Sequence, residues 1–312
     1  MDEKELLKID EDLRLLVYTR WPNDAKHALP QCIFHYTSVE VLFKILEESR
    51  IQLTHFRYME DISEQTWAIQ TIIDNLKNRS CWEKELKLKD ILTRVIDRLE
   101  KYLKDKDFDK NQIFIASFSR DGNNLSQWRE YGDRCAGISL GINPSGLQLD
   151  FFTNSSKRYF SREGGFINVI YEQSEIKETI DNIYNKAAEF IRERLTNELL
   201  LDHVEVEKIA DILYGLYLEI SIAIKHPSYL VENEVRLVCR LAGQKGLSIL
   251  YRGGKTPYIE SSLIDTNGLI PISTIFTGPK LPQSDIASIN KALEDHGYKF
   301  SWEAVLPSGI PY

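Results

Sequence analysis

The segment Ile113-Phe114-Ile115-Ala116-Ser117-Phe118-Ser119 decides the fold class. It begins with apolar residues on both faces, which is typical of a strand buried in the middle of a sheet. Further strands are predicted at residues 31–36, 51–54, 136–142, 166–171, 234–241, 257–263, 272–277 and 298–300. The strands cluster between long helical stretches, so the pattern favours an α+β fold with a mixed or antiparallel sheet over regular βαβ alternation.

The helical stretches are predicted as insertions into one domain. Hydrophobic residues make up 43% of the 312-residue chain, enough for a sizeable core, and no Pro-, Gly- or Ser-rich linker divides it. We therefore expect a single domain over residues 1–312. It comprises a β-rich core at about 31–60, 111–172 and 226–303, helical insertions at about 62–104 and 174–224, and an N-terminal helical arm at 1–22.

The charge of the chain limits its partners. The formal net charge is −8, and general nucleic-acid binding needs Lys and Arg to neutralise phosphates. The first residues lack the basic and apolar regions of a signal peptide, and no later run reaches the roughly 18 apolar residues of a membrane span. We therefore expect a cytoplasmic protein with no general nucleic-acid binding and no membrane partner.

Common nucleotide and metal signatures are missing from the sequence. Neither G-x-G-x-x-G, G-x-x-x-x-G-K-[ST] nor H-E-x-x-H occurs. The cysteines at 32, 81, 135 and 239 are scattered, with no C-x-x-C pair and no His at ligand spacing. We expect reduced thiols and no metal.

Glu232, Glu234 and Arg236 are spaced by two at the start of the strand predicted over 234–241. If the backbone is extended, their side chains lie on one face, roughly 7 Å apart. One carboxylate could then stabilise an oxocarbenium-like centre at a ribose C1, while the other orients or deprotonates an acceptor. Alternatively the face is solvated and one glutamate pairs with Arg236, which is worth under about 1 kcal/mol if exposed.

His35, Tyr36 and Thr37 end a predicted strand and precede a helix whose start carries the capping box Thr37-Ser38-Val39-Glu40. A helix N-terminus can face an anion or a phosphate, and His35 could donate a hydrogen bond to a ligand hydroxyl. The alternative is a structural histidine whose hydrogen bonds are satisfied within the protein.

Aromatic and hydroxyl side chains gather between residues 117 and 131. Trp128 and Tyr131 are three apart in a short predicted helix, so they could stack on a nucleobase or a nicotinamide ring. Ser117 and Ser119 would offer hydroxyls nearby. Equally, Trp and Tyr at helical spacing are typical core residues.

Together these segments resemble the bacterial domain of unknown function family numbered 2971. Its members show an H-Y-T-S-like start, an S-F-S strand, W-x-x-Y-G and E-N-E-V-R in this order. In this sequence the four motifs begin at His35, Ser117, Trp128 and Glu232. Lys225-His226-Pro227 and Thr277-Gly278-Pro279-Lys280 also fit, so the resemblance spans about residues 31–312.

The chain is also remotely similar to the ADP-ribosyltransferase fold, in which a His, a Ser or Tyr strand and a late E-x-E surround NAD. This resemblance implies an ADP-ribosyltransferase-like core that uses NAD as a substrate. Catalytic roles would fall to His35, which contacts a ribose hydroxyl, to Glu234, which bonds the nicotinamide ribose, and to Glu232, which assists the acceptor. The ligand site would be lined by Tyr36, Thr37, Ser117, Ser119, Trp128, Tyr131 and Arg236.

Two functions therefore remain open. One is an NAD-dependent ADP-ribosyltransferase-like enzyme or an NAD glycohydrolase, acting in the bacterial cytosol. The other is a non-catalytic module that binds a nucleotide or a protein in stress or phage-defence signalling. In both cases we expect the segments 35–37, 117–131 and 232–236 to converge in one pocket, because a binding site needs convergent polar groups beside an apolar wall.

Overall fold

The computed structural model describes residues 8, 10, 13, 29–59, 62–105, 112–147, 164–196, 202–241, 249–300 and 303–311. The chain divides into two compact units. The helical unit comprises Met1–Ala28, Glu60–Asn111 and Val169–Tyr229; the sheet unit comprises Leu29–Met59, Gln112–Asn168 and Leu230–Tyr312. Apart from residues 8, 10 and 13, the predicted N-terminal arm lies outside the described residues, and the single domain remains a prediction.

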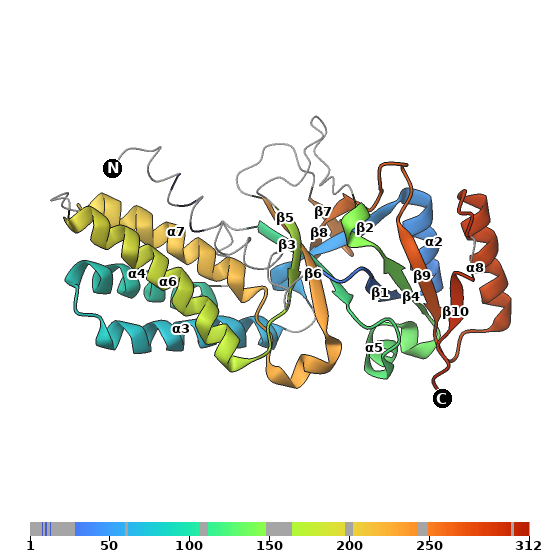
Figure 1. The fold of residues 1–312 in the computed structure, drawn as a ribbon, viewed down its shortest axis with the longest axis horizontal. Coiled ribbons are helices and arrows are strands. Elements are labelled where there is room, and N and C mark those ends of the chain that lie inside the picture. The colour runs from blue at the N-terminus through green and yellow to red at the C-terminus, as the bar shows by residue number, and fades with distance from the viewer. Residues whose placement is uncertain are drawn as a thin grey trace. The chain divides into compact units, whose positions relative to one another are not determined.

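The sheet unit contains a ten-stranded sheet with the order β10-β9-β4-β1-β3-β2-β8-β7, while β6 pairs with β3 and β5 (Figure 1). The strands are β1 (Ile33–Thr37), β2 (Arg50–His55), β3 (Gln112–Ser119), β4 (Ile138–Ile142), β5 (Gly164–Asn168), β6 (Glu234–Leu241), β7 (Leu250–Arg252), β8 (Thr256–Ser262), β9 (Ile272–Thr277) and β10 (Val305–Pro307). All strand pairs are antiparallel except the parallel pair of β10 with β9. The prediction of an α+β fold with a mixed sheet is confirmed.

Strand β3 is central, as its apolar sequence predicts. It pairs with β6 along its whole length, and it also pairs with β1 near Ser119 and with β2 near Ile115. One predicted edge strand is wrong: residues 298–300 belong to no strand, and the last strand is β10. The Tyr298 and Phe300 rings stack with their centroids 5.8 Å apart and pack against the apolar core instead.

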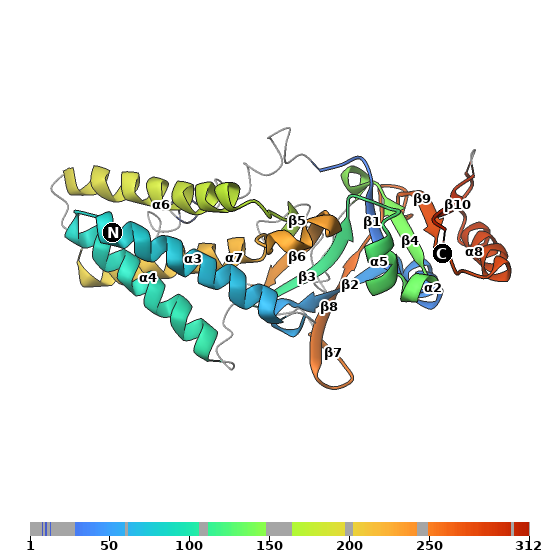
Figure 2. The ribbon, with the colours of Figure 1, turned by 90° about the horizontal axis from the view of Figure 1, so that it is seen from below.

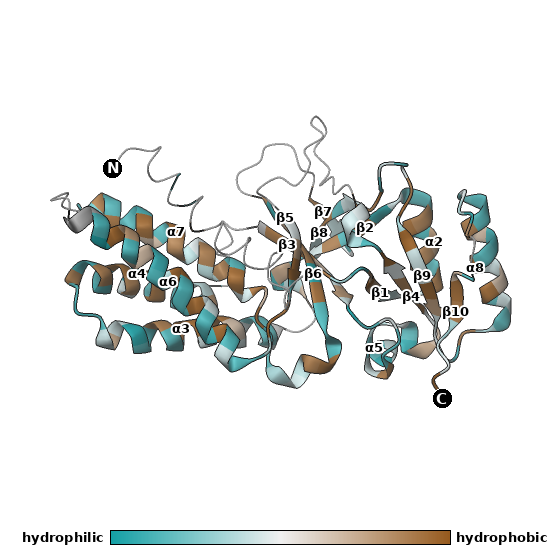
Figure 3. Ribbon diagram, viewed as in Figure 1, coloured by the Kyte–Doolittle hydropathy of each residue, from teal (hydrophilic) through white to brown (hydrophobic). Residues whose placement is uncertain are grey.

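Two helices of the sheet unit, α2 (Val39–Glu48) and α8 (Gln283–Asp295), pack on one face of the sheet. Leu42 and Ile289 belong with strand residues such as Leu140 to one apolar core. Figure 3 shows hydrophobic segments in brown along α2, α8 and the strands. The N-cap of α2 is Ser38, whose side chain accepts a hydrogen bond from the Val41 amide. The predicted capping box from Thr37 to Glu40 is therefore wrong: the N-cap is Ser38, and Val41 at the third helical position has no side chain that could bond back to it.

Shorter helical elements complete the sheet unit. They are α5 (Leu125–Glu130) and the 3₁₀ turns η1 (Phe56–Tyr58), η2 (Asp133–Cys135) and η3 (Pro144–Gly146), while a fourth turn, η4 (Pro227–Glu232), leads into β6. Both α5 and η2 lie between β3 and β4 in the chain. Most of the predicted site residues lie on β1, β3 and β6, whereas Glu232, Trp128 and Tyr131 lie in the segments that connect strands.

The helical unit contains α3 (Ile62–Trp82), α4 (Leu86–Lys104), α6 (Gln173–Thr196) and α7 (His203–Ser221), shown side by side in Figure 2. Helix α4 contacts both α3 and α7, and buries apolar residues at helical spacing from Leu88 to Leu99. Asp202 and Glu205 form a capping box at the start of α7. The helices predicted in both insertions are confirmed in the described residues.

Candidate functional site

The centre of the predicted site is a buried ion pair on β6. The Arg236 guanidinium donates from Nε to Glu234 Oε1 at 2.7 Å and from its terminal nitrogen to Glu234 Oε2 at 2.9 Å. Glu234 is 4% exposed and Arg236 is 3% exposed. A bidentate pair of this kind fixes both side chains, and removing one partner would leave a buried charge uncompensated.

Strand register determines which predicted residues share a face with this pair. Ser119 lies opposite Glu234 and Ser117 opposite Arg236, and directly paired residues of antiparallel strands project to the same side. Phe34 lies opposite Ser119, so Tyr36, two residues further along β1, is also on this face. The structure therefore brings Tyr36, Ser117, Ser119, Glu234 and Arg236 together on one side of the sheet.

His35 and Thr37 point to the other side, because successive strand residues alternate. The ring of His35 lies 5.5 Å from the ring of Phe118, centroid to centroid, and its Nδ1 is 3.1 Å from the Ser117 carbonyl oxygen, to which it donates. Burial lowers the pKa of His35, and the hydrogen bond to Ser117 opposes that shift only partly. His35 and Glu234 therefore do not face a common ligand position on the sheet.

Glu232 departs from the expectation that it shares a strand face with Glu234. It belongs to the η4 turn, and strand β6 begins only at Glu234. Between them Asn233 has a φ of 46°, a left-handed conformation that Asn tolerates better than most residues. The extended spacing assumed from the sequence is interrupted here, so the two carboxylates are not presented as neighbours of one strand.

The hydroxyl groups of Tyr36 and Ser119 hold the loop after β3. Tyr36 donates to the Asp121 carbonyl at 2.8 Å and accepts from the Asn124 amide at 2.9 Å. Ser119 donates to the Glu232 carbonyl at 2.7 Å and accepts from the Asp121 amide. Both hydroxyls are thus engaged in backbone contacts that join the motif segments.

Asn123 and Asn124 make structural hydrogen bonds in the site that sequence reasoning missed. Asn124 caps α5 by accepting from the Ser126 amide at 2.9 Å, and its side chain also donates to the Val231 carbonyl at 3.1 Å. Asn123 accepts from Trp128 Nε1 at 3.0 Å. An asparagine before a short helical pattern is an N-cap signal, so Asn124 could have been found from the sequence.

Trp128 and Tyr131 have different environments. Trp128 is completely buried, and its ring meets Tyr36 edge-on with the centroids 4.9 Å apart, in a small cluster that includes Cys135. Tyr131 follows the last turn of α5 and is 48% exposed. The interpretation of Trp128 as a core residue fits this geometry, whereas the Tyr131 side chain is partly exposed to solvent.

The backbone after α5 is left-handed at three successive residues that are not glycine. Asp133, Arg134 and Cys135 have φ values of 48°, 51° and 76°. Such a conformation costs roughly 1–2 kcal/mol per residue, so the surrounding structure must impose it. The Cys135 carbonyl accepts from the Lys280 amide at 2.9 Å, and the Ala136 amide bonds to the Asp133 carbonyl at 3.0 Å.

Three glycines allow this turn to pack closely. A Cβ on Gly132 would approach Trp128 Cε3 to 2.6 Å, and a Cβ on Gly137 would overlap the Thr37 carbonyl oxygen. A Cβ on Gly278 would overlap the Cys135 carbonyl oxygen. The glycines of W-x-x-Y-G and T-G-P-K are therefore explained by close packing around the left-handed turn.

We define the α5–η2 surface as the exposed side chains of this region. They are Arg129, Glu130, Tyr131, Asp133 and Arg134, all classed as exposed. Trp128 and Cys135 lie buried beneath them. The result is a surface that presents aromatic and charged groups of both signs above buried side chains.

Residues 137–141 read Gly-Ile-Ser-Leu-Gly and match the pattern of a G-x-S-x-G nucleophile elbow. An elbow needs its serine exposed on a sharp turn between a strand and a helix. Ser139 instead lies within β4, is fully buried, and pairs in register with Tyr36. Its position does not provide a nucleophile.

In the part of the chain that the structure describes, no group of three or more His, Cys, Asp or Glu side chains is arranged to hold a metal ion. Within the same residues, no helix is long and apolar enough to cross a membrane.

The fold and the site define an α+β protein whose motif residues surround a buried ion pair and a strained turn. The model of the family described as "Protein of unknown function (DUF2971)" matches residues 127–237. The matched span contains W-x-x-Y-G and E-N-E-V-R, so the similarity to this family is supported over that segment. No curated protein and no solved structure matches the chain. The resemblance to the ADP-ribosyltransferase fold remains a prediction.

Proposed function

We propose that this protein is a non-catalytic module that binds a protein partner through the α5–η2 surface. The observation that carries the proposal is the run of three left-handed residues at Asp133, Arg134 and Cys135 beside an exposed tyrosine. Strained backbone persists where surrounding contacts impose it, and it concentrates at sites of recognition or catalysis. Here the strain fixes the positions of exposed side chains.

The composition of the surface favours a protein over a nucleotide. Tyr and Arg are among the residue types that contribute most binding energy at protein interfaces. Arg129 and Arg134 are balanced by Glu130 and Asp133, so the surface has no net charge to select a polyphosphate. A rigid, mixed-charge surface with an aromatic anchor suits a protein that presents complementary charges around an apolar recess.

The ion pair on β6 supports a structural role for the motif carboxylate. Each Glu234 oxygen accepts a hydrogen bond from Arg236, and the pair is buried. A carboxylate whose charge is already compensated stabilises an oxocarbenium-like centre poorly. The NAD-dependent enzyme implied by the remote resemblance stays a prediction, as do the cytoplasmic location and a part in phage-defence signalling.

Site-specific crosslinking tests the proposed surface. A photo-crosslinking amino acid replaces Glu130 on the α5–η2 surface, and in a matched control it replaces Tyr251, which is 61% exposed on β7. After irradiation of the cells that naturally make the protein, the account predicts one discrete adduct from position 130 and none of that size from position 251. Adding Tyr131→Ala and Arg134→Ala to the probe chain should remove the adduct, because truncating anchor residues weakens an interface.

The same experiment can reject the proposal. Identical adducts from both positions, or an adduct from position 130 that survives the two alanine substitutions, would show that the α5–η2 surface selects no partner. Both probe positions are exposed, so each chain should fold, and a melting curve of the purified protein checks this.

A further inference from the structure

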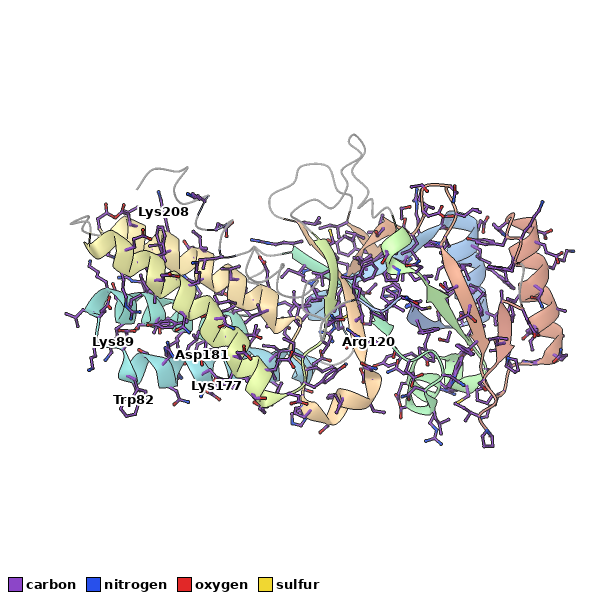
Figure 4. All side chains as sticks on the ribbon, viewed as in Figure 1. Trp82, Lys89, Arg120, Lys177, Asp181 and Lys208 are labelled. Carbon is purple, nitrogen blue, oxygen red and sulfur yellow. The ribbon has the colours of Figure 1, made fainter. Side chains whose placement is uncertain are left out.

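Two large apolar side chains are almost fully exposed where α3 is followed by α4. Trp82, the last residue of α3, is 84% exposed, and Leu86, the first residue of α4, is 83% exposed. Figure 4 shows Trp82 pointing away from the helices, at the end of the helical unit that also carries Lys89. We call residues 82–89 the α3–α4 tip.

Helical phase explains why these residues face outward. Leu86 precedes the buried Leu88 by two positions, which is roughly 200° around a helix of 3.6 residues per turn. Trp82 lies six positions after the buried Leu76 and is likewise off the apolar stripe of α3. Packing within the helical unit therefore does not account for either side chain.

The α3–α4 tip is also locally basic, although the whole chain is acidic. Lys84, Lys87 and Lys89 form no ion pair with the described residues, and Lys89 shares a side of α4 with Leu86, three positions away. Glu83 and Glu85 are both held by Arg192 of α6, at 3.6 Å and 2.5 Å between charged atoms. Three lysines and Arg192 against two glutamates leave an excess of two positive charges.

We propose that the α3–α4 tip docks on a membrane surface that contains anionic phospholipids. Trp82 and Leu86 would enter the boundary between headgroups and acyl chains, where Trp is enriched, and Lys84, Lys87 and Lys89 would contact the lipid phosphates. The positive charge of the α3–α4 tip and the small area of its apolar patch both favour a membrane surface as the binding partner. Two apolar side chains form a far smaller patch than the roughly 800 Å² that each partner buries in a stable protein interface, whereas membrane docking needs only a small wedge with flanking cations.

This proposal replaces the expectation of no membrane partner. That expectation followed from the lack of a spanning segment, and no helix among the described residues could span a bilayer. Docking on a surface needs no such helix. The α3–α4 tip belongs to the helical unit and the α5–η2 surface to the sheet unit, so the two proposals are independent.

Vesicle sedimentation with the full chain provides the test. Vesicles of phosphatidylcholine alone are compared with vesicles that contain about 30% phosphatidylglycerol, which gives a negative surface potential. The wild type should bind the anionic vesicles and not the neutral ones, and binding should fall when NaCl rises from about 0.1 M to about 0.5 M. Trp82→Ser and Lys84→Glu should each weaken binding by about tenfold or more.

Two control variants carry an aromatic-to-serine and a lysine-to-glutamate change outside the α3–α4 tip. Tyr251→Ser and Lys255→Glu alter an exposed aromatic and an exposed lysine at β7 and the turn after it, and should leave vesicle binding unchanged. All four positions are exposed, so melting temperatures should stay close to that of the wild type.

Three results would overturn the proposal. The first is that the wild type stays in solution with anionic vesicles. The second is that Trp82→Ser binds as tightly as the wild type, or that the controls weaken binding equally. The third is a wild-type dimer, seen by analytical ultracentrifugation without lipid, that Trp82→Ser dissociates, because the α3–α4 tip would then be covered by a second copy of the chain.

Discussion

Arg236 holds both carboxylate oxygens of Glu234, two residues before it on the same strand, and the pair is buried in the sheet. An isolated buried charge is strongly unfavourable, so each partner depends on the other. The E-N-E-V-R motif is therefore explained by a structural interaction before any chemistry is invoked.

Glu234→Gln is expected to destabilise the protein by about 3–5 kcal/mol, because it removes the carboxylate charge that faces the buried Arg236 guanidinium. The double variant Glu234→Leu with Arg236→Met removes both charges and should recover most of that loss. Urea unfolding followed by circular dichroism measures both. A Glu234→Gln protein as stable as the wild type would mean that the ion pair contributes little.

Tyr36→Phe should cost about 1–3 kcal/mol, because the Asn124 amide and the Asp121 carbonyl both lose their partner. Tyr251→Phe removes a hydroxyl from an exposed side chain and should change stability by less than about 0.5 kcal/mol. Thermal melting of the two variants, run in parallel, gives the comparison. Equal melting temperatures would contradict a structural role for the Tyr36 hydroxyl.

Arg134→Gly should raise stability by up to about 1 kcal/mol, because glycine adopts the left-handed conformation without the steric cost but is more flexible when unfolded. Arg129→Gly, in the helical backbone of α5, should lower stability by about 1 kcal/mol. The two changes remove the same type of side chain at positions five residues apart. If both lower stability alike, the turn at Arg134 is not strained.

Stability should fall as the solution becomes acidic, partly because of His35. Its folded-state pKa is lowered from 6.5 by burial, so the unfolded chain binds the proton more readily. The stability that neutral His35 contributes is fully present above about pH 6.5. It is lost as the pH falls towards the lower folded-state pKa of His35. His35→Gln should therefore lose less stability than the wild type between about pH 7.5 and pH 5.5.

His203→Gln serves as the control for this pH dependence, because the His203 side chain is 74% exposed. Urea unfolding at both pH values should show that His203→Gln loses as much stability on acidification as the wild type. If His35→Gln loses as much stability on acidification as the wild type, the acid sensitivity comes from other groups.

Much of the fold could be predicted from local pattern. The apolar start of β3 indicated its central position, and the spacing of Leu88, Leu92, Val95 and Leu99 indicated the buried side of α4. These features depend on residues close together in the chain, where periodicity specifies the buried face. The predicted strand at 298–300 failed because aromatic residues also pack in coil.

The site was harder to predict because it depends on register and on single backbone angles. Whether His35 faces Glu234 is decided by the pairing of Phe34 with Ser119, and a shift of one residue would reverse it. The left-handed Asn233 interrupts the extended spacing of Glu232 and Glu234. Neither feature leaves a periodic signal in the sequence.

The most direct test of the central claim is nicotinamide release from NAD by the purified protein. If the motif residues stabilise structure rather than perform chemistry, the wild type should release no more nicotinamide than a protein-free blank. Release by the wild type that falls by roughly a hundredfold or more in Glu234→Gln, below the melting temperature of that variant, would instead assign Glu234 to catalysis and contradict the account.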